Sequence, residues 1–581
     1  VMANKRILIV GGVAGGATCA ARIRRLCEHC EIIIFEMGSY VSFANCGLPY
    51  FIGDVIVEED KLLVATPELF KNRFNIQVCT DSQVTSIDKA NKSIVVNDLL
   101  SGQSRVEHYD ALVLSTGASA VWPDIEGIDL PGIYALRTIP DSRKIRSALE
   151  NIKQAVVMGA GYLGLELAEN LTKRGVEVTL LQSSNQLMPT LDKEMASYIE
   201  KHITQQGISC RLNSKVSKFQ QTPEQALNLT LENGDVITAD AVMISIGVKP
   251  RVELAEQAGL EIGDHGGVRV NEHMQSSDEN IWAVGDMVEV RHVITKEWHL
   301  FPLAGPANRQ GRLAAAHIVG HEFAGASTNM SYRGVQGTSV CGLFDMTVAT
   351  TGVNEKQLKA ADYTQYEKVY LHPSNHVGYY PGAKPIHMKL IYDSTNGKIL
   401  GAQALGEAGV ARRIDVISAF IQMDATVYDL EEAELCYAPQ FGATKDPVNL
   451  AGMLAANQLR DNHPLARWEE LMESHVQVVD TENQEEADQL LSLILDDPYQ
   501  QAQIVDVRTV AEFENKHIPN AINVPLDSLR ERLDELSRER EVWVVCGVGQ
   551  RAYNATRILQ QHGFHVKNLS GGMQTYHSYL E

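Results

Sequence analysis

A complete Gly-x-Gly-x-x-Gly motif between a predicted strand and a predicted helix constrains the fold more than any other feature. The strand is expected at 155–158, and the motif begins at Gly159 and runs into helix-forming residues through Glu166. In this context the glycines form a tight turn and let a pyrophosphate approach the positive end of the helix. The motif therefore predicts a parallel βαβ unit, which we expect to bind the nicotinamide nucleotide.

A second strand, turn and helix of this kind opens the chain. A buried strand is expected at 6–10, a glycine-rich turn at 11–16 and a helix ending near Leu26. Val13 stands at the second glycine position, so the turn alone is a weak motif. Glu36 strengthens it, because a carboxylate at the end of the next strand can accept both ribose hydroxyls of an adenosine. Together the two units predict an α/β fold with two Rossmann-like nucleotide-binding domains.

Cys46 is the main candidate for chemistry. It lies shortly after the strand expected at 31–36, where such a fold holds the reactive ring of its cofactor. Residues 47–53 contain no second cysteine, so Cys46 has no nearby dithiol partner. A lone redox thiol must pass through a mixed disulfide with a small thiol, a sulfenic acid or a persulfide. The alternative is a buried structural cysteine.

Length, charge and cysteine usage narrow the class of protein. A chain of 581 residues suggests about three to five domains. The formal net charge of −22, without a Lys/Arg cluster, argues against a nucleic-acid or membrane partner. Nine irregularly spaced cysteines, with no signal peptide or membrane-spanning apolar run, favour the reducing cytoplasm. Cys27 and Cys30 are not followed by a second ligand pair, so no metal is predicted.

Residues 11–20, 23–26 and 42–46 resemble the coenzyme A-disulfide reductases, and the resemblance extends to about residue 455. It implies a flavoenzyme in which NAD(P)H reduces coenzyme A disulfide, coenzyme A persulfide or polysulfide through Cys46. FAD, NADH (with NADPH possible) and coenzyme A, as substrate or bound ligand, are the implied small molecules. A homodimer is the implied assembly.

The remainder of the chain resembles rhodanese. Residues 506–508 and 517–521 match in order, and a strand expected at 541–545 leads into Cys546. The glycines of the following loop let successive N–H groups point at the sulfur, which stabilises a thiolate or its persulfide. Sulfane-sulfur transfer at Cys546, with Arg551 as a second catalytic candidate, is therefore implied. The whole chain is similar to fusions of the two families, some of which act as NADH-dependent persulfide reductases.

The resemblance also implies domain boundaries. We expect an FAD-binding domain at 1–118 and 246–328, an NAD(P)H-binding domain at 119–245, an α+β dimerisation domain at 329–455, a linker at 456–475 and an α/β rhodanese domain at 476–581. Within these domains we expect strands at 109–117, 280–286 and 386–392, and helices at 412–423 and 483–495.

The expected site residues fall into three groups. The cofactor-binding candidates are Gly11, Gly12, Ala14, Gly15, Glu36, Val84, Thr116, Gly117, Gly159, Gly161, Tyr162, Leu163, Glu166, Gln182, Gly247, Asp286 and Ala304. Asp286 is expected to hold the ribityl chain, and neutral Gln182 offers neither an acid to the ribose nor a cation to a 2′-phosphate, so the NADH preference depends on the family. The coenzyme A candidates are Arg22, Arg25, Ser42, Asn45, Lys71 and Arg73.

Two tyrosine-bearing segments, 376–382 and 436–439, resemble those that reach the partner subunit's cysteine. Tyr437 is the third catalytic candidate, because its hydroxyl could donate to a departing thiolate across the dimer interface. Ordinary interface packing is the alternative for Tyr379 and Tyr380.

Two other functions remain open. An NADH oxidase or peroxidase would use a sulfenic acid on Cys46, since such flavoproteins share this scaffold. Alternatively, the rhodanese domain could be an independent sulfur-delivery module that takes no part in the reductase cycle.

Overall fold

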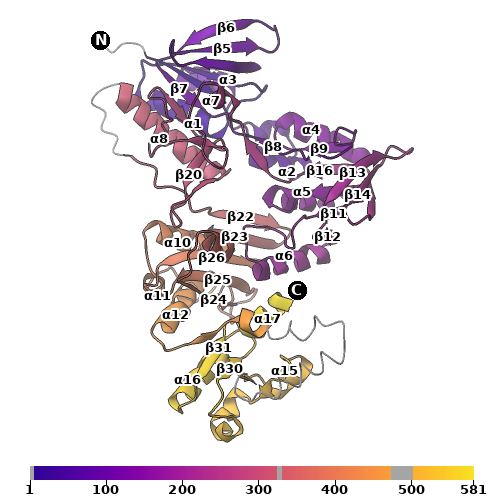
Figure 1. Ribbon diagram of the computed structural model, residues 1–581, viewed down its shortest axis with the longest axis vertical. Helices are drawn as coiled ribbons and strands as arrows, with labels where there is room; N and C mark the ends of the chain where they lie inside the picture. The colour runs from indigo at the N-terminus through magenta and orange to yellow at the C-terminus, as the bar shows by residue number, and fades with distance from the viewer. Residues whose placement is uncertain (1–4, 323–329, 473–501, 581) are drawn as a thin grey trace. The chain divides into compact units, whose positions relative to one another are not determined.

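The structure is a computed structural model that describes residues 5–322, 330–472 and 502–580 (Figure 1). It divides into two compact units, one made of 1–188 with 203–337 and the other of 189–202 with 338–581. Sheets and helices alternate in the first unit, and the second unit contains one antiparallel and one parallel sheet. The predicted mixed α/β fold class is confirmed.

The first unit begins with a parallel five-stranded sheet of order β19-β7-β1-β2-β3. In that order, the strands span Ile281–Ala283, Ala111–Leu114, Arg6–Val10, Glu31–Phe35 and Gln77–Cys79. Helices α1 (Ala14–Leu26) and α8 (Ala304–Glu322) pack against each other beside it. The strands predicted at 6–10 and 31–36 are confirmed, whereas those predicted at 109–117 and 280–286 are present but shorter. Cys27 and Cys30 are buried in the hydrophobic core here.

A second parallel sheet of the same size forms the other nucleotide-binding domain. Its order is β12-β11-β10-β16-β9, with strands Ser209–Arg211, Glu177–Leu181, Gln154–Met158, Ala241–Ile244 and Ile133–Ala135. The predicted glycine motif joins β10 to α5 (Tyr162–Lys173). A Cβ on Gly164 would lie 1.9 Å from the carbonyl oxygen of Gly159, so only glycine lets the helix approach the strand this closely. Helix α6 (Lys193–Gln205) follows β11 in the chain.

Smaller elements complete the first unit. Three of them are three-stranded sheets: β4 (Ser82–Asp88), β5 (Ser93–Asp98) and β6 (Ser104–His108); β13 (Val216–Gln221), β14 (Leu227–Leu231) and β15 (Val236–Ala239); and β18 (Val268–Arg269), β20 (Val288–Arg291) and β21 (Trp298–Leu300). A two-stranded sheet pairs β8 (Ala118–Ala120) with β17 (Val248–Pro250). The short helices α2 (Leu48–Ile52), α3 (Pro67–Phe74) and α4 (Ile139–Ala148) carry or adjoin the residues discussed below.

The dimerisation domain is an antiparallel five-stranded sheet of order β22-β23-β26-β25-β24. Its strands span Ser339–Leu343, Met346–Gly352, Ile399–Gly406, Ile386–Asp393 and Tyr366–Leu371, and the helices are α9 (Glu355–Ala360), α10 (Val410–Gln422), α11 (Val427–Glu431) and α12 (Pro447–Leu459). The predicted strand at 386–392 and the predicted helix at 412–423 are both present, the latter beginning two residues earlier.

The rhodanese domain is a parallel sheet of order β27-β31-β30-β28-β29. Its strands span Leu465–Ala466, Val566–Leu569, Val542–Val545, Gln503–Asp506 and Ile522–Asn523, with helices α15 (Val510–Asn515), α16 (Gln550–Gln561) and α17 (Gly572–Leu580).

The stretch expected as a linker, 456–475, differs in the structure. Its first residues complete α12, and Leu465–Ala466 form β27, which pairs with β31. Trp468 is fully buried behind this strand. Two-residue strands lack the periodicity that reveals longer ones, which explains why the sequence did not indicate it. The helix expected at 483–495 lies outside the described residues.

No helix among the described residues is both long enough and apolar enough to cross a membrane.

Candidate active sites

Cys46 lies in a single 3-10 turn, Asn45–Gly47, that leads into α2. The thiol is exposed, and the Asn45 side-chain oxygen accepts hydrogen bonds from the Cys46 backbone N–H at 3.0 Å and from Sγ at 3.6 Å. Partial burial, followed by the negative charges of Glu166 and Asp286, raises the pKa of Cys46, whereas Arg137 opposes the shift. The site can therefore adjust the reactivity of this thiol through neighbouring charges.

Glu166, expected only as a nucleotide-binding residue, has a neighbour in the Cys46 segment. Tyr50, four residues after Cys46, donates to Glu166 Oε1 at 3.3 Å. Burial raises the pKa of Glu166 to about 7. A carboxyl that titrates near neutrality can exchange a proton at physiological pH. Cys46 lies in the 3-10 turn before α2 and Tyr50 lies in α2, so the closeness of the two residues in the sequence is the signal that could have identified Tyr50.

The expected flavin residues gather at the ends of the first sheet. Glu36 follows β2 and accepts from Gly12 N at 2.8 Å and from Gly38 N at 2.9 Å, while burial raises its pKa. Thr116 follows β7 and donates to the Arg251 carbonyl at 2.6 Å. The remaining candidates at this end include Gly11 in the turn, Ala14 and Gly15 in α1, Gly117 after β7, Asp286 after β19, Ala304 at the start of α8, and Val84 in β4. Apart from Val84 and Ala304, these residues follow the carboxyl ends of parallel strands, where such folds bind dinucleotides.

The second dinucleotide unit repeats one contact of the first. Gln182 follows β11, is buried, and accepts from Ala160 N at 2.9 Å, just as Glu36 accepts from Gly12 N. Its amide nitrogen donates to Ser184 Oγ at 2.7 Å. The Gln182 carboxamide thus anchors the glycine turn. Gly159 and Gly161 form that turn, Tyr162 and Leu163 begin α5, and Gly247 follows β16 with φ +126°.

Basic residues collect where α1 meets α8. Burial, then the charges of Arg312 and Arg25, lowers the pKa of Arg22. Arg22 Nε is buried and has no hydrogen-bond partner within the described part of the chain. Next to them Thr18 Oγ1 donates to Asn308 Oδ1 at 2.5 Å. Arg312 and this pair were not predicted, because α8 carries no recognisable motif, but together these groups could bind an anion.

The other coenzyme A candidates lie on nearby segments of the first unit. Ser42 has a left-handed backbone, φ 48°, in the loop before Cys46. Lys71 and Arg73 are exposed on α3. The buried Arg24 links α1 to the end of α3, because its guanidinium donates to the carbonyl oxygens of Phe74 at 2.7 Å and Asn75 at 2.8 Å.

Tyr437 and Tyr379 form a pair in the dimerisation domain. Their hydroxyls lie 2.8 Å apart, and this hydrogen bond raises the pKa of Tyr437. Both rings are exposed, 43% for Tyr437 and 75% for Tyr379, and Tyr380 is 43% exposed, so this surface could face a partner subunit. The pairing was not predicted, because 58 residues separate the two tyrosines.

Cys546 lies directly after β30 and is buried. Gly549 N donates to its sulfur at 3.1 Å, and Gly549 has φ +103°, which a glycine adopts at no steric cost. Arg551, at the start of α16, is paired with Glu512 of α15 at 2.8 and 2.7 Å. This pairing lowers the pKa of Glu512 to about 2. The loop thus presents the Gly549 amide to the sulfur, while Arg551 is held by a carboxylate.

Comparison with known proteins agrees with this arrangement. The family profile described as pyridine nucleotide-disulphide oxidoreductase matches 5–311, its dimerisation domain matches 338–446, and a rhodanese-like domain matches 470–579. The chain belongs to the pyridine nucleotide-disulphide oxidoreductase family. It is therefore a flavin- and nicotinamide-dependent oxidoreductase that carries a rhodanese domain.

Relatives of the reductase match much or all of its length. A coenzyme A disulfide reductase of Staphylococcus haemolyticus is 34% identical over 78% of this chain and 99% of its own. The solved structure of reduced Bacillus anthracis CoADR-RHD has 41% identity and a TM-score of 0.92, covering 99% of this chain and 98% of that one. A NAD-dependent persulfide reductase from A. fulgidus has 34% identity and a TM-score of 0.86, covering 98% and 100%.

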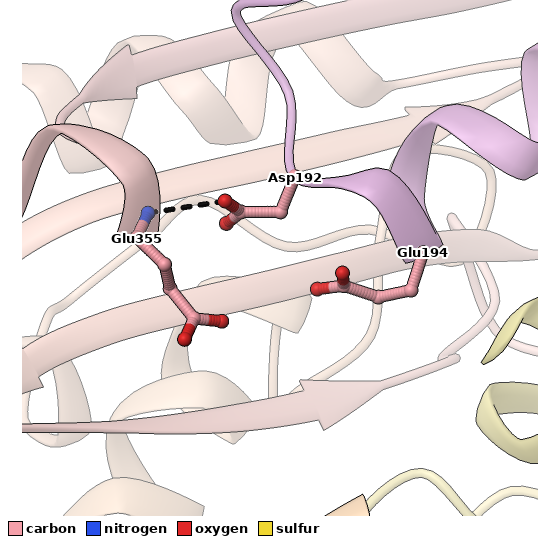
Figure 2. Close-up of side chains that lie close together, drawn as sticks. All are labelled: Asp192, Glu194 and Glu355. Atoms are coloured by element: carbon pink, nitrogen blue, oxygen red, sulfur yellow. Dashed lines mark hydrogen bonds between the residues drawn. The ribbon is translucent and has the colours of Figure 1, made fainter. Parts of the chain in front are cut away.

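One further cluster of titratable groups lies in the second unit of the reductase (Figure 2). Asp192, Glu194 and Glu355 bring carboxylate oxygens within 4.8 Å of one another, a spacing that could suit a metal ion. However, the Lys389 ammonium bonds all three, at 2.7, 2.5 and 2.5 Å respectively. Burial opposes the charge of Lys389, but the three carboxylates raise its pKa well above the ordinary value. The Lys389 ammonium therefore occupies the position that a metal ion would take.

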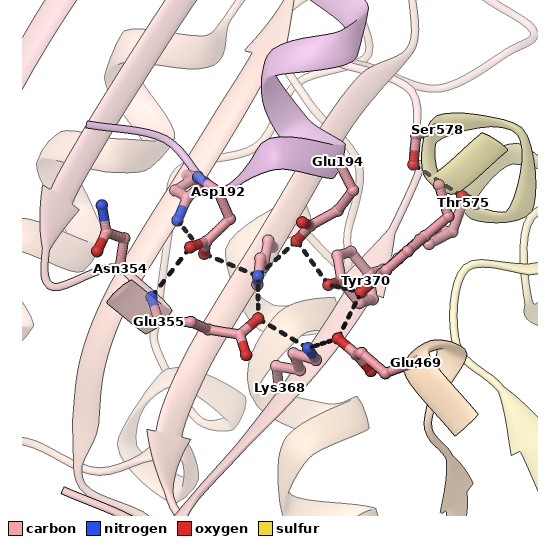
Figure 3. A network of polar contacts seen from close by, with 12 residues as sticks. Asp192, Glu194, Asn354, Glu355, Lys368, Tyr370, Glu469, Thr575 and Ser578 are labelled. Atoms are coloured by element: carbon pink, nitrogen blue, oxygen red, sulfur yellow. Dashed lines mark hydrogen bonds and ion pairs between the residues drawn. The ribbon is translucent and has the colours of Figure 1, made fainter. Parts of the chain in front are cut away.

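Two of these carboxylates, Glu194 and Glu355, belong to a closed ring of polar contacts (Figure 3). On one side of the ring Lys389 pairs with Glu194, and the Tyr370 hydroxyl donates to Glu194. The Tyr370 hydroxyl lies 2.8 Å from the Tyr579 hydroxyl, which lies 2.9 Å from Glu469 Oε1. Glu469 pairs with Lys368, Lys368 with Glu355, and Glu355 with Lys389, which closes the ring. The ring joins the start of α6, the dimerisation sheet and the last helix of the rhodanese domain. We call it the Lys389 ring.

Proposed function

We propose that the reductase uses NADH to reduce coenzyme A persulfide, polysulfide and coenzyme A disulfide through FAD and the single redox cysteine Cys46, with sulfane-sulfur transfer at Cys546. The observation that carries this proposal is the exposed Cys46, placed after the first dinucleotide unit without a second cysteine in 47–53. The substrate classes come from the full-length similarity to a persulfide reductase and to CoADR-RHD.

The residues around Cys46 fit a thiol that alternates between two states. The Cys46 thiolate would attack the substrate sulfur and release a thiol or hydrosulfide, and Asn45 would orient it. Bound FAD supplies the electrons that return Cys46 to the thiolate. Glu166, with a pKa of about 7, can hold or release a proton beside this centre.

Coenzyme A is the part of the substrate whose phosphates fit the basic side chains of α1 and α8. Arg22, Arg25 and Arg312 offer guanidinium groups to its phosphates, and the unpartnered Arg22 Nε supports a ligand there. Ser42 and Asn45 would contact the pantetheine end, because they flank Cys46. We assign Lys71 and Arg73 a supporting role, since they are exposed on the adjoining helix α3.

NADH is proposed as the electron donor because the segment after β11 offers a 2′-phosphate no cation, with Gln182 followed by two serines. A homodimer is expected from the dimerisation domain. We further propose that Tyr437 acts as a proton donor to Cys46 of the partner subunit. The cytoplasm is the proposed location, because nine cysteines without a disulfide spacing suit a reducing compartment.

The deciding experiment compares NADH oxidation with coenzyme A persulfide, polysulfide, coenzyme A disulfide and hydrogen peroxide. Cys46→Ser should lose disulfide and persulfide reduction at least about a thousandfold, because the nucleophile is gone, while FAD remains bound. Cys210→Ser, which changes a partly exposed thiol on β12, is the matched control and should retain activity. Full turnover by Cys46→Ser would refute the assignment, and peroxide as the preferred substrate would favour the oxidase or peroxidase alternative.

A further inference from the structure

Helix α17 lies between the Cys546 loop and the dimerisation domain, and two successive glycines let it contact both. A Cβ on Gly572 would lie 2.2 Å from the Cys546 carbonyl oxygen. A Cβ on Gly571 would lie 2.9 Å from His372 Nε2 and 2.9 Å from Tyr370 Cβ. Both glycines have positive φ, +74° and +63° for 571 and 572. The chain entering α17 is therefore in close contact with the loop on one side and the residues of the dimerisation domain on the other.

The first turn of α17 holds the backbone of the Cys546 loop. Met573 N donates to the Cys546 carbonyl at 2.7 Å, and Gln574 N donates to the Gly547 carbonyl at 3.0 Å. These amides belong to the helix N-terminus, so they would otherwise lack partners. A displacement of α17 would move the peptide groups that carry the sulfur.

The next residues of α17 bond the dimerisation domain. Thr575 Oγ1 lies 2.8 Å from His372 Nε2, and His372 Nδ1 lies 2.8 Å from His387 Nδ1. Burial, followed by the charge of His387, holds the pKa of His372 well below its usual value, so the imidazole is neutral and can both donate and accept.

Further contacts fix both ends of the helix. Ser570 Oγ, just before α17, accepts from Tyr370 N at 2.8 Å and donates to Tyr370 O at 3.2 Å. Near the other end, Tyr579 contributes its hydroxyl to the Lys389 ring. The Tyr198 hydroxyl of α6 donates to the Gln574 carbonyl at 3.1 Å. The rhodanese helix is thus bonded to the reductase along its whole length.

We propose that His372 and Tyr370 are positioning residues for sulfur transfer at Cys546, acting through Thr575 and the rest of α17. The dimerisation domain thereby sets the geometry of the rhodanese loop. This inference rests on the proposed role of Cys546 as a sulfane-sulfur carrier.

The affected step is the loading of Cys546. The Cys546 thiolate forms an S–S bond to the outer sulfur of a low-molecular-weight persulfide, the bond between the two donor sulfurs breaks, and the donor leaves as a thiolate with the electron pair. The proton of the outer sulfur stays with the new Cys546 persulfide, and no net oxidation occurs. The attack requires the sulfur to be held correctly by the loop amides, so a small loop shift slows it.

The test uses full-length protein and measures two rates at Cys546 by mass spectrometry: loading by glutathione persulfide and alkylation by iodoacetamide. Thr575→Val keeps the shape but loses the bond to His372, and should slow both rates about fivefold, as expected for one buried hydrogen bond. Thr575→Ser should restore them. Ser578→Ala is the matched control, since the Ser578 hydroxyl is also buried but donates to the Thr575 carbonyl within the helix. Alkylation of Cys46 should be unchanged throughout.

A double substitution tests the pairing itself. His372→Phe combined with Thr575→Val should be no slower than His372→Phe alone, because both remove the same contact. Unchanged loading in Thr575→Val, or an equal loss in Ser578→Ala, would overturn the inference. The loading rate of the wild-type protein distinguishes a failure of this inference from a failure of the proposed function. If wild-type Cys546 is not loaded at all, its role as a sulfur carrier is wrong, and so is the positioning role of His372 and Tyr370.

Discussion

At the scale of single residues, the reactivity of Cys46 depends on charges that surround it. Glu166 is one of the two acids that raise the pKa of Cys46, and its own pKa is about 7. Its effect should therefore appear above neutral pH, where the carboxyl is ionised, and be weak below it.

Glu166→Gln should lower the pKa of Cys46, because an anion that disfavours the thiolate is removed. The expected result is a shift of the alkylation pH profile of Cys46 toward lower pH, with little change in the acid limb. Iodoacetamide labelling across the pH range measures this, and Tyr50→Phe is a control that removes the hydrogen bond but keeps the carboxyl. A profile that moves to higher pH would contradict the assignment.

The residues that sequence could predict are those whose chemistry is local. Cys546 and the two glycine turns follow buried strands directly, and Cys46 lies in the segment that follows β2, so nearby residues in the sequence determine their placement. Lys389 could not be predicted in the same way, since a lysine in a strand normally faces water, whereas here it is fully buried. Its partners come from segments as distant as Asp192 and Glu355, and only the tertiary structure brings them together.

At the scale of elements, the contact between β25 and its neighbours contains a partly buried base, His387. His387 stacks on Tyr198 of α6 at 4.4 Å and bonds His372. Burial lowers the pKa of His387 from 6.5 to about 4. The unfolded chain therefore binds more protons than the folded protein between these values, and the free energy of unfolding decreases as the pH falls through this window.

The midpoint temperature of thermal unfolding should consequently decrease as the pH is lowered from about 6.5 to about 4. The decrease should be larger than in a protein whose histidines are all exposed. His387→Gln removes the titrating group and should flatten the dependence, although it lowers the midpoint at neutral pH by removing the stack on Tyr198. His29→Gln changes an exposed histidine and serves as the control. Parallel curves for wild type and His387→Gln would show that another group causes the loss.

Element boundaries also show where sequence reasoning stops. Long strands and glycine turns can be predicted from the sequence, but β27 cannot, because its two residues have no detectable alternation. The missed strand matters, since it places Trp468 where its indole N–H donates to the Ser570 carbonyl at 2.8 Å. The connection between the domains is therefore itself part of the rhodanese fold and of the α17 contact.

At the scale of the whole molecule, the two cysteines are proposed to share one sulfur pathway. Coenzyme A disulfide already carries the pantetheine group that Ser42 and Asn45 would bind, whereas inorganic polysulfide has no group that these residues could bind. Polysulfide sulfur would therefore be loaded on Cys546 first. A covalently linked partner site provides an effective concentration of about millimolar, which separate proteins at low concentration cannot match.

Cys546→Ser should accordingly reduce NADH oxidation with polysulfide about tenfold or more, and leave coenzyme A disulfide reduction almost unchanged. The buried position of Cys546 makes a structural control necessary, and Cys546→Ala supplies it, because both substitutions keep a small side chain. Equal losses with both substrates would indicate structural damage. Full activity with both would instead favour a rhodanese domain that delivers sulfur independently of Cys46, since a loaded Cys546 would then have no part in supplying the reductase cycle.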